Sequence, residues 1–198
     1  MYAGFLKRGL DVIFSILLLL FLFPLLLIVS GLILILDGQP VFFVQTRPGK
    51  NGIPFKIWKF RTMRKDAEGK LSDVQRITRT GHWLRKTSID ELPQLWNVIC
   101  GEMSLIGPRP LLMEYLPLYN QRQQKRHLVR PGITGLAQVH GRNATTWRER
   151  LEWDVIYTEK LSFWLDCKIL VATGLIVLGG SGVSKTAEVT MEPFQGDQ

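Results

Sequence analysis

The sequence has 198 residues, with 25 Lys and Arg against 17 Asp and Glu, and its formal net charge is +8. An apolar content of 46% excludes an intrinsically disordered chain. The only two cysteines, Cys100 and Cys167, exclude a scaffold held together by several disulfides. Together with three histidines at unsuitable spacings, they do not provide a zinc site.

The first predicted element is an apolar helix. Residues 12–36 carry no charge, and 21 of these 25 residues are Val, Ile, Leu or Phe. A helix in a soluble domain would have a polar face, and the apolar part of a signal peptide is about 7–15 residues long. We therefore expect this segment to stay in the chain and to insert into the membrane.

The surroundings of this helix predict how it inserts. Pro24 lies at its midpoint, and basic residues flank both of its ends, with Lys7 and Arg8 on the N-terminal side. Proline interrupts a helix, and basic flanks remain on the cytoplasmic side. The pattern favours a helix that enters, bends at Pro24 and returns to the same face. A kinked helix that spans the membrane once is the alternative.

The rest of the chain predicts an α+β fold of short elements. We expect strands at 41–47 and 53–63, a turn at 48–52, and helices at 89–99, 112–124 and from Trp147 onwards. Residues 146–149 have the spacing of a capping box, and 133–139 are expected to be extended. The apolar run 169–178 predicts an amphipathic or half-buried helix at the membrane surface. The domains are thus residues 1–40 in the membrane and residues 41–198 in the cytoplasm.

Two neighbouring carboxylates, Asp90 and Glu91, lie where a helix is expected to begin. One interpretation is structural, because Ser88 and Glu91 have the spacing of a capping box. The other is that the two acids face a phosphate or a metal ion. Helix N-termini bind anions, and adjacent carboxylates can hold Mg²⁺ against a phosphate. The two interpretations are compatible.

Basic side chains for an anionic ligand are concentrated in residues 41–90, which hold 12 basic and 4 acidic groups. Lys59 and Arg61 share one face of the second expected strand. Arg109 lies between two prolines that fix its backbone, which suits bidentate phosphate binding, while a salt bridge to a nearby acid is the alternative. Acidic lipid headgroups would also explain much of this charge. A glycine-rich stretch, 130–143, offers further donors at Arg130, Thr134, Gln138, Arg142 and Asn143.

Several motifs together resemble those of the bacterial sugar transferase family, the small monotopic polyprenyl-phosphate phosphoglycosyl transferases. In chain order they are Lys7-Arg8-x-x-Asp11, Gln45-x-Arg47-Pro48-Gly49, Lys59-Phe60-Arg61-Thr62-Met63, Ser88-x-Asp90-Glu91-Leu92-Pro93-Gln94, Gly101-x-Met103-Ser104-x-Ile106-Gly107-Pro108-Arg109-Pro110, Arg130-Pro131-Gly132-Ile133-Thr134-Gly135 and Gly141-Arg142-Asn143. The resemblance covers nearly the whole chain. The compact length and the tail at 181–185 most resemble members acting on UDP-diacetylbacillosamine.

The resemblance implies a re-entrant membrane helix and a catalytic domain on the cytoplasmic face of the bacterial inner membrane. It also implies transfer of a sugar-1-phosphate from a UDP-sugar to undecaprenyl phosphate, with UMP released and an aspartyl phosphosugar formed on Asp90. Glu91 would complete the dyad and hold Mg²⁺ with Asp90. Under this reaction, the basic residues described above make Lys59, Arg61, Arg85 and Arg109 the candidate phosphate ligands, and the glycine-rich stretch makes Arg130, Gln138, Arg142 and Asn143 the candidate nucleotide-sugar ligands. Phe23 stands where family members often have a serine, which concerns the re-entrant geometry alone.

The expected partners are the UDP-sugar, undecaprenyl phosphate, inner-membrane lipid and downstream glycosyltransferases, without nucleic acid. The expected donor is UDP-N,N'-diacetylbacillosamine or another UDP-N-acetylhexosamine, used in the first membrane step of glycoconjugate assembly. The alternatives are UDP-glucose or UDP-galactose for exopolysaccharide, or a non-enzymatic, membrane-anchored basic module. Such a module explains the charge and the anchor but leaves the Asp90-Glu91 pair and the proline-flanked Arg109 unexplained.

Overall fold

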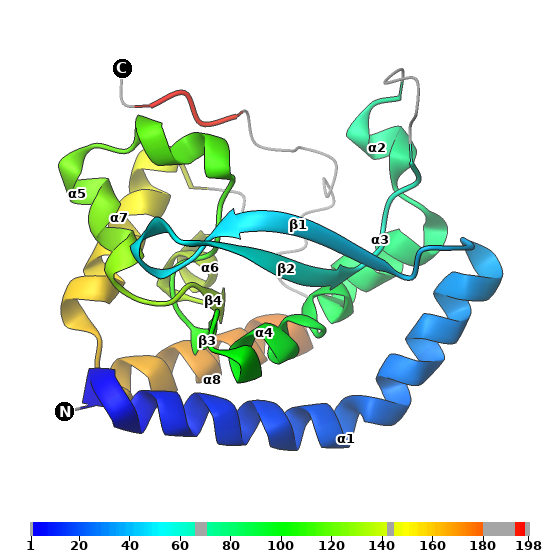
Figure 1. Cartoon of the computed structure of the whole chain (residues 1–198), viewed down its shortest axis with the longest axis horizontal. Coiled ribbons are helices and arrows are strands. Elements are labelled where there is room, and N and C mark those ends of the chain that lie inside the picture. Colours follow the sequence, from blue (N-terminus) through cyan, green and yellow to red (C-terminus); the bar gives the residue numbers. More distant parts are fainter. Residues whose placement is uncertain (1, 66–70, 142–144, 180–192, 197–198) are drawn as a thin grey trace.

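The computed structural model describes residues 2–65, 71–141, 145–179 and 193–196 (Figure 1). Its largest element is helix α1 (Lys7–Leu36), which follows a π-helical turn, η1 (Tyr2–Leu6). α1 runs along one side of the molecule and then turns towards strand β1 (Phe42–Pro48; Figure 1). Pro24 lies inside α1, where it removes one backbone hydrogen bond and favours a bend.

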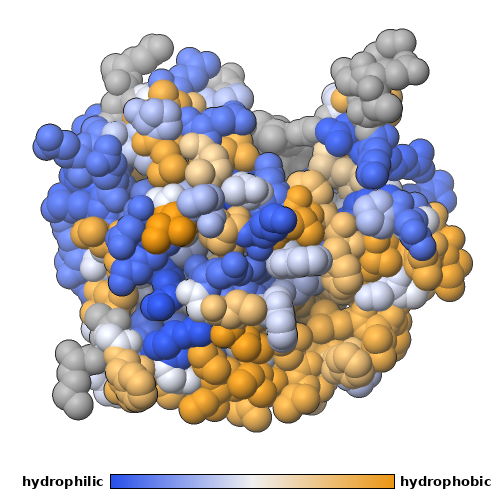
Figure 2. All heavy atoms as spheres, viewed as in Figure 1, coloured by the Kyte–Doolittle hydropathy of each residue, from blue (hydrophilic) through white to orange (hydrophobic). Residues whose placement is uncertain are grey.

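The side chains of α1 are apolar and largely exposed. Phe21 and Ile35 are each 80% exposed, and Figure 2 shows that hydrophobic residues cover the edge of the molecule formed by α1. The segment Gly4–Leu36 is long and apolar enough to cross a membrane. A surface this apolar is unfavourable in water, so α1 is compatible with the predicted membrane anchor.

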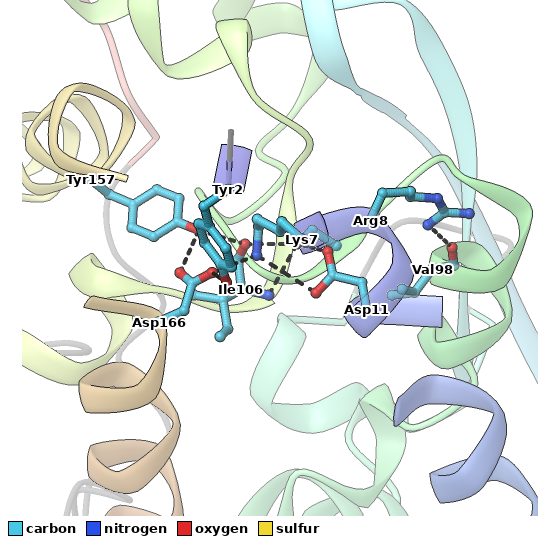
Figure 3. A network of polar contacts seen from close by, with 9 residues as sticks. Tyr2, Lys7, Arg8, Asp11, Val98, Ile106, Tyr157 and Asp166 are labelled. Atoms are coloured by element: carbon cyan, nitrogen blue, oxygen red, sulfur yellow. Dashed lines mark hydrogen bonds and ion pairs between the residues drawn. The ribbon is translucent and has the colours of Figure 1, made fainter. Parts of the chain in front are cut away.

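The N-terminal end of α1 is bound to the globular domain by buried polar contacts (Figure 3). Lys7 Nζ lies 2.8 Å from Asp166 Oδ2 and 3.6 Å from Asp11 Oδ1, and all three residues are buried. Arg8 donates to the backbone carbonyls of Val98 and Ile99. These contacts join α1 to helices α4 (Gln94–Cys100) and α8 (Phe163–Gly179), which are far away in the sequence.

The C-terminal end of α1 is bound to the same domain. Thr78 Oγ1 donates to Asp37 Oδ2 at 3.0 Å, and the Arg61 guanidinium donates to the carbonyls of residues 37, 38 and 39. Val29 and Ile33, nearly inaccessible to solvent, pack with Phe60 and Leu84 in one core cluster. Both ends of the apolar helix therefore rest on one globular domain.

The predicted hairpin is confirmed, with the first strand shifted by one residue and the second shorter than expected. β1 (Phe42–Pro48) pairs antiparallel with β2 (Pro54–Phe60), from Phe42 opposite Phe60 to Pro48 opposite Pro54. The turn contains the 3-10 segment η2 (Lys50–Gly52), in which Asn51 and Gly52 adopt positive φ. Phe55 and Ile57 of β2 pack with Val98 and Met103 in a second core cluster.

The region expected to be one helix at 89–99 contains two short elements. Helices α2 (Asp73–Arg76) and α3 (Arg79–Thr87) are followed by the 3-10 turn η3 (Ile89–Glu91) and then α4 (Gln94–Cys100). The predicted capping box at Ser88 is wrong. Ser88 has φ 57 and ends α3, its N–H bonding back to α3 carbonyls, and its side chain makes no capping bond.

The C-terminal half adds two parallel strands and further helices. β3 (Ser104–Ile106) pairs with β4 (Gly132–Thr134). The predicted helix 112–124 is divided into η4 (Met113–Leu118), which contains Pro117, and α5 (Gln121–Gln124), restarted by an Asn120 capping box; η5 (Lys125–Leu128) follows. The predicted extended stretch 133–139 is wrong after Thr134, because α6 (Leu136–Gly141) begins there.

The last two helices agree better with the sequence. The capping box at Thr146 and Glu149 is confirmed and opens α7 (Trp147–Lys160). α8 (Phe163–Gly179) contains the predicted helix 169–178 and is half-buried, with Ile169 inside and Val171 and Leu175 exposed. It is not amphipathic, because its exposed side is also apolar. In Figure 1 α8 lies next to the first part of α1.

Candidate functional site

A cleft of about 1080 Å³ is enclosed by α1, the hairpin, α3, η3, α6, α7 and α8. One wall is apolar and includes Leu18 and Leu22 of α1 and Leu170 and Val177 of α8. The basic residues lining the cleft are Arg47, Lys59, Arg61, Arg64, Lys65, Arg76, Arg85, Lys86, Arg109 and Arg150, and the acidic ones are Asp90, Glu91 and Asp154. A basic cleft with an apolar wall suits an anionic ligand that carries a hydrocarbon chain.

The two predicted carboxylates lie together in this cleft on η3. Ser88 reverses the chain after α3, and backbone bonds from Glu91 N to Ser88 O and from Leu92 N to Ile89 O close the short turn. A 3-10 turn gives consecutive residues different directions. Asp90 and Glu91 therefore meet different surroundings, although they are neighbours in the sequence.

Glu91 is held by two cations. Its Oε1 accepts from Lys59 Nζ at 2.7 Å and from Arg109 Nη2 at 2.6 Å, and its Oε2 accepts from Arg109 Nη1 at 3.2 Å. Burial opposes ionisation of Glu91, but the charges of Arg109 and Lys59 and their hydrogen bonds hold its pKa well below the usual range. Glu91 is therefore an ionised carboxylate whose oxygens are already engaged.

Asp90 has no side-chain hydrogen bond or ion pair within the described ranges, although it is only 9% exposed. Burial, followed by the charge of Glu91, raises its pKa to about 6, against the opposing effects of Lys59, Arg109 and Arg85. A carboxylate with this pKa is more basic than an ordinary aspartate and is still mostly ionised at neutral pH. Asp90 is therefore the member of the pair whose carboxylate is not engaged by another side chain of the described structure.

Arg109 is held through its backbone carbonyl as well as through its guanidinium. Its backbone carbonyl accepts a 2.6 Å hydrogen bond from Arg126 Nη2, and the same nitrogen lies 2.7 Å from Asp154 Oδ2. Arg126 and Asp154 are each 2% exposed. The bidentate geometry predicted for Arg109 is present, and it is directed at Glu91. The salt-bridge interpretation of Arg109 therefore describes this structure.

The structure places the other predicted phosphate ligands differently. Lys59 contacts Glu91, and Arg85 lines the cleft with its Nε donating to Thr62 Oγ1 at 2.9 Å. Arg61 also lines the cleft, but its two Nη atoms donate to the backbone that follows α1. Its main visible role is thus to hold the end of that helix, a role that the strand pattern did not predict.

The predicted nucleotide-sugar ligands are not all brought together. Gln138 lines the cleft. Arg130 does not belong to the described lining: its Nε donates to Gly101 O at 2.8 Å, and its charge lies near Arg8 at the start of α1. The contact of Arg130 with the nucleotide-sugar therefore stays a prediction, and in this structure Arg130 is engaged with Gly101 instead. Arg142 and Asn143 lie outside the described residues.

Sequence reasoning missed three cleft or support residues, Arg126, Arg150 and Asp154. Arg150 and Asp154 line the cleft one helical turn apart on α7, and the spacing of opposite charges at i and i+4 was the available signal. Arg126 belongs to no motif that we recognised. It is the element η5 that brings it against Asp154.

The implied Mg²⁺ fits one part of this site. In the described part of the chain no three His, Cys, Asp or Glu side chains gather as a metal site. The oxygens of Glu91 are occupied by cations, while those of Asp90 are open. Mg²⁺ often binds through one or two carboxylates, with water and substrate phosphates as the other ligands. Asp90 suits such a shared site. Glu91 could bind Mg²⁺ there only if Arg109 and Lys59 gave up one of its carboxylate oxygens.

Comparisons with known proteins bear on this geometry. The family model described as "Bacterial sugar transferase" matches residues 2–180. The uncharacterized sugar transferase EpsL of Bacillus subtilis is 50% identical over 194 residues, which cover 96% of each chain. The UDP-N-acetylgalactosamine-undecaprenyl-phosphate N-acetylgalactosaminephosphotransferase of Aeromonas hydrophila is 39% identical over 90% of this chain and 45% of its own length.

A third relative extends the range of sugars. The UDP-glucose:undecaprenyl-phosphate glucose-1-phosphate transferase of Klebsiella pneumoniae is 40% identical over 84% of this chain. The chain spans only about 39% of that protein's length. These matches confirm the resemblance to the bacterial sugar transferase family, and they confirm that the chain is a sugar transferase enzyme and not a binding module without catalysis. The likeness to members acting on UDP-diacetylbacillosamine stays a prediction.

Proposed function

The chain belongs to the bacterial sugar transferase family, and on that premise we propose that it moves a sugar-1-phosphate from a UDP-sugar to undecaprenyl phosphate and releases UMP. The reaction would take place on the cytoplasmic face of the inner membrane, as the first membrane step of glycoconjugate assembly. The observation that carries the proposal is the contrast between Asp90, open to the cleft, and Glu91, held by Lys59 and Arg109.

In the proposed first step, an oxygen of Asp90 attacks the phosphorus that bears the sugar. The bond from that phosphorus to the bridging oxygen breaks, and UMP leaves with the bridging oxygen. In the second step, an oxygen of undecaprenyl phosphate attacks the aspartyl phosphosugar, and the Asp90–phosphorus bond breaks. Covalent catalysis divides one transfer into two steps, so a single cleft serves a nucleotide and a lipid in turn.

Glu91 is proposed to act through the two cations that it binds. It holds Lys59 and Arg109 next to Asp90, where their charges would face a diphosphate and stabilise the charge that develops on transfer. Arg85 and Arg61 are proposed as further phosphate contacts from the cleft wall. Mg²⁺ bound to Asp90 and the substrate phosphates would reduce the repulsion between the carboxylate and the diphosphate.

We propose that α1 enters the membrane and returns to the same face. The buried contact of Lys7 and the partly buried contact of Arg8 at one end, and the partly buried contact of Asp37 at the other, fasten both ends of α1 to one domain. A helix that crossed the membrane would place these two ends about 30 Å apart on opposite sides of the hydrocarbon core. The apolar cleft wall formed by Leu18 and Leu170 would then receive the polyprenyl chain from the bilayer.

The proposed donor is a UDP-N-acetylhexosamine, with UDP-N,N'-diacetylbacillosamine as one member of that class. The relative named for UDP-N-acetylgalactosamine supports the class, while the relative named for UDP-glucose supports the alternative of an unsubstituted hexose. In the donor pocket, Gln138 is the proposed contact within the described cleft, with Arg142 and Asn143 proposed from the sequence.

The test is UMP release by the full-length protein in detergent, with Mg²⁺, undecaprenyl phosphate and a panel of UDP-sugars. One UDP-sugar should give UMP at a rate that depends on the enzyme, and the Asp90→Asn variant should give none. Without the lipid acceptor, mass spectrometry of the protein should find the sugar phosphate on the peptide containing Asp90. Lipid binding without UMP release from any donor would refute the proposed reaction.

A further inference from the structure

Two polar side chains in the cleft wall have buried atoms without a partner. Asp154 of α7 is 2% exposed, and its Oδ2 accepts from Arg126 Nη2 at 2.7 Å and Nε at 3.1 Å. Its other oxygen, Oδ1, is buried with no hydrogen bond in the described part of the chain. The same holds for both amide atoms of Gln138 on α6. Both residues line the cleft that contains Asp90.

Such atoms are costly to the folded state. A buried donor or acceptor without a partner destabilises a protein, and three such atoms belong to two cleft-lining residues. Groups that lack a partner in the protein are satisfied when a ligand supplies it. Because Arg126 binds Oδ2 with two nitrogens, the orientation of Oδ1 is fixed too. A fixed orientation is what a contact needs if it is to discriminate between ligands.

The position of Asp154 indicates which part of the ligand it would contact. The same Arg126 nitrogen that binds Asp154 also donates to the backbone carbonyl of Arg109, whose guanidinium holds Glu91. Asp154 is thus connected through the Arg126 guanidinium to Arg109, the residue that binds Glu91 of the dyad. In a nucleotide-sugar whose transferred phosphorus is at Asp90, the group attached directly to that phosphate is the sugar.

We propose that Asp154 Oδ1 and the Gln138 amide form a recognition subsite for the hydroxyl and acetamido groups of the donor sugar. This inference rests on the proposed function and deepens it. The carboxylate oxygen accepts from a sugar O–H or N–H, and the amide both donates and accepts, which suits a hydroxyl or an acetamido carbonyl. Ribose and uracil offer similar groups, so the experiment has to distinguish the sugar from the nucleoside.

The main test is the Gln138→Met variant, which removes the amide at nearly constant size. Because the amide has no partner in the described protein, we expect the melting temperature to stay equal or rise. The KM for the UDP-sugar should rise at least tenfold, with kcat changed less than threefold. The matched control is Gln123→Met: that buried side chain makes a capping bond with Asn120, so the control should lose stability and keep its KM.

The second variant is Asp154→Asn. The amide oxygen has to face the Arg126 donors, so the amide nitrogen replaces Oδ1 in the cleft and an acceptor becomes a donor. We expect a tenfold or greater rise in KM for the UDP-sugar. When the donor lacks the matching hydroxyl, KM should rise less in Asp154→Asn than it does in wild type. If Asp154→Asn does not fold, the Gln138→Met result and the wild-type response to deoxy donors decide.

Inhibition by UMP separates the two parts of the donor. If the subsite binds the sugar, the inhibition constant of UMP should be the same in Gln138→Met, Asp154→Asn and wild type. A weakening of UMP equal to the rise in KM would assign these residues to the nucleoside and overturn the proposal, as would an unchanged KM in Gln138→Met. By contrast, a wild-type protein that releases no UMP from any UDP-sugar would refute the proposed function itself.

Discussion

Arg109 donates two hydrogen bonds to Glu91, at 2.6 and 3.2 Å, and so holds both carboxylate oxygens of that residue. The preceding residue, Asp90, has no such contact in the described structure and faces the same cleft. Two adjacent acids thus have different chemistry, because one is neutralised by cations and the other is buried without a partner. The first three predictions follow from this contrast.

Replacing each acid in turn should separate their roles. Asp90→Asn should abolish UMP release, because an amide is not a nucleophile, whereas Glu91→Gln should retain a small activity, since Lys59 and Arg109 remain nearby. The measurement is UMP release in detergent with Mg²⁺. Activity of Asp90→Asn comparable to that of wild type would contradict the assignment of the nucleophile.

Arg109→Lys should reduce kcat/KM at least tenfold, about 1.4 kcal/mol, with the fold unchanged. Lysine is a point charge and cannot bind both oxygens of Glu91 in the planar geometry of the guanidinium. The exposed surface pair of Arg122 and Glu152 provides a control: Arg122→Lys should keep full activity. An Arg109→Lys variant as active as wild type would show that bidentate binding is not needed.

The activity should fall in acid with a midpoint near pH 6 in kcat/KM, because Asp90 has to be ionised to attack and its pKa is raised to about 6. In Glu91→Gln the midpoint should move to lower pH. Removing the neighbouring negative charge, which raises the pKa of Asp90, makes its ionised form more favourable. A midpoint that moved upwards would contradict this account of the dyad.

The same pKa has a consequence for stability. Since the folded pKa of Asp90 lies above its ordinary value of 3.8, its contribution to the free energy of unfolding is fully present below about pH 4 and is lost as pH rises through about 6. Asp90→Asn should therefore be more stable than wild type at pH 7.5, by about 3 kcal/mol. Thermal unfolding at pH 7.5 and at pH 4 should show the difference disappear in acid.

Lys7→Met should destabilise the protein by about 3–5 kcal/mol, because it leaves the buried carboxylates of Asp11 and Asp166 without their cation. The measurement is thermal unfolding in detergent. Lys50→Met is the control, since Lys50 is exposed in the hairpin turn and makes no ion pair in the described structure. Equal melting temperatures for Lys7→Met and wild type would mean that this network does not hold the helix.

Local features of the fold were predictable from the sequence. The turn at 48–52 specified the hairpin, and the spacing of Thr146 and Glu149 specified the start of α7, because both depend on neighbouring residues alone. Ser88 shows the limit of this reasoning. It has the same spacing to Glu91, but the end of α3 requires a left-handed residue at that position, and this requirement prevails over the cap.

The site was predictable where its residues form motifs, as for Asp90, Glu91, Lys59 and Arg109. Long-range pairing was not predictable. Lys7 and Asp166 are 159 positions apart, and no pattern in either segment predicts their contact. Arg61 follows the strand alternation that suggested a ligand, yet the end of α1 comes close enough to take its hydrogen bonds. Such pairs depend on tertiary packing.

The last prediction concerns topology: residues 1–8 and residues 41–198 should lie on the same, cytoplasmic, side of the membrane. The reason is the pair of anchors at the two ends of α1, Lys7 with Asp166 and Asp37 with Thr78, which one domain supplies. Single cysteines replacing Gly4 and Lys50, both exposed, can be introduced into a Cys100→Ala, Cys167→Ala background. An impermeant maleimide should label neither position in intact spheroplasts and both after permeabilisation.

The Pro24→Ala variant tests what enforces the return of the helix. Restoring the missing N–H should straighten α1 and favour a crossing, while the buried contacts of Lys7 oppose one. We therefore expect Pro24→Ala alone to expose position 4 to the maleimide in a minor fraction of molecules. Pro24→Ala combined with Lys7→Met should expose it in most, because both the bend and the anchor are then lost. Labelling of position 4 in the wild-type background of intact spheroplasts would instead show that α1 spans the membrane and that Pro24 only kinks it.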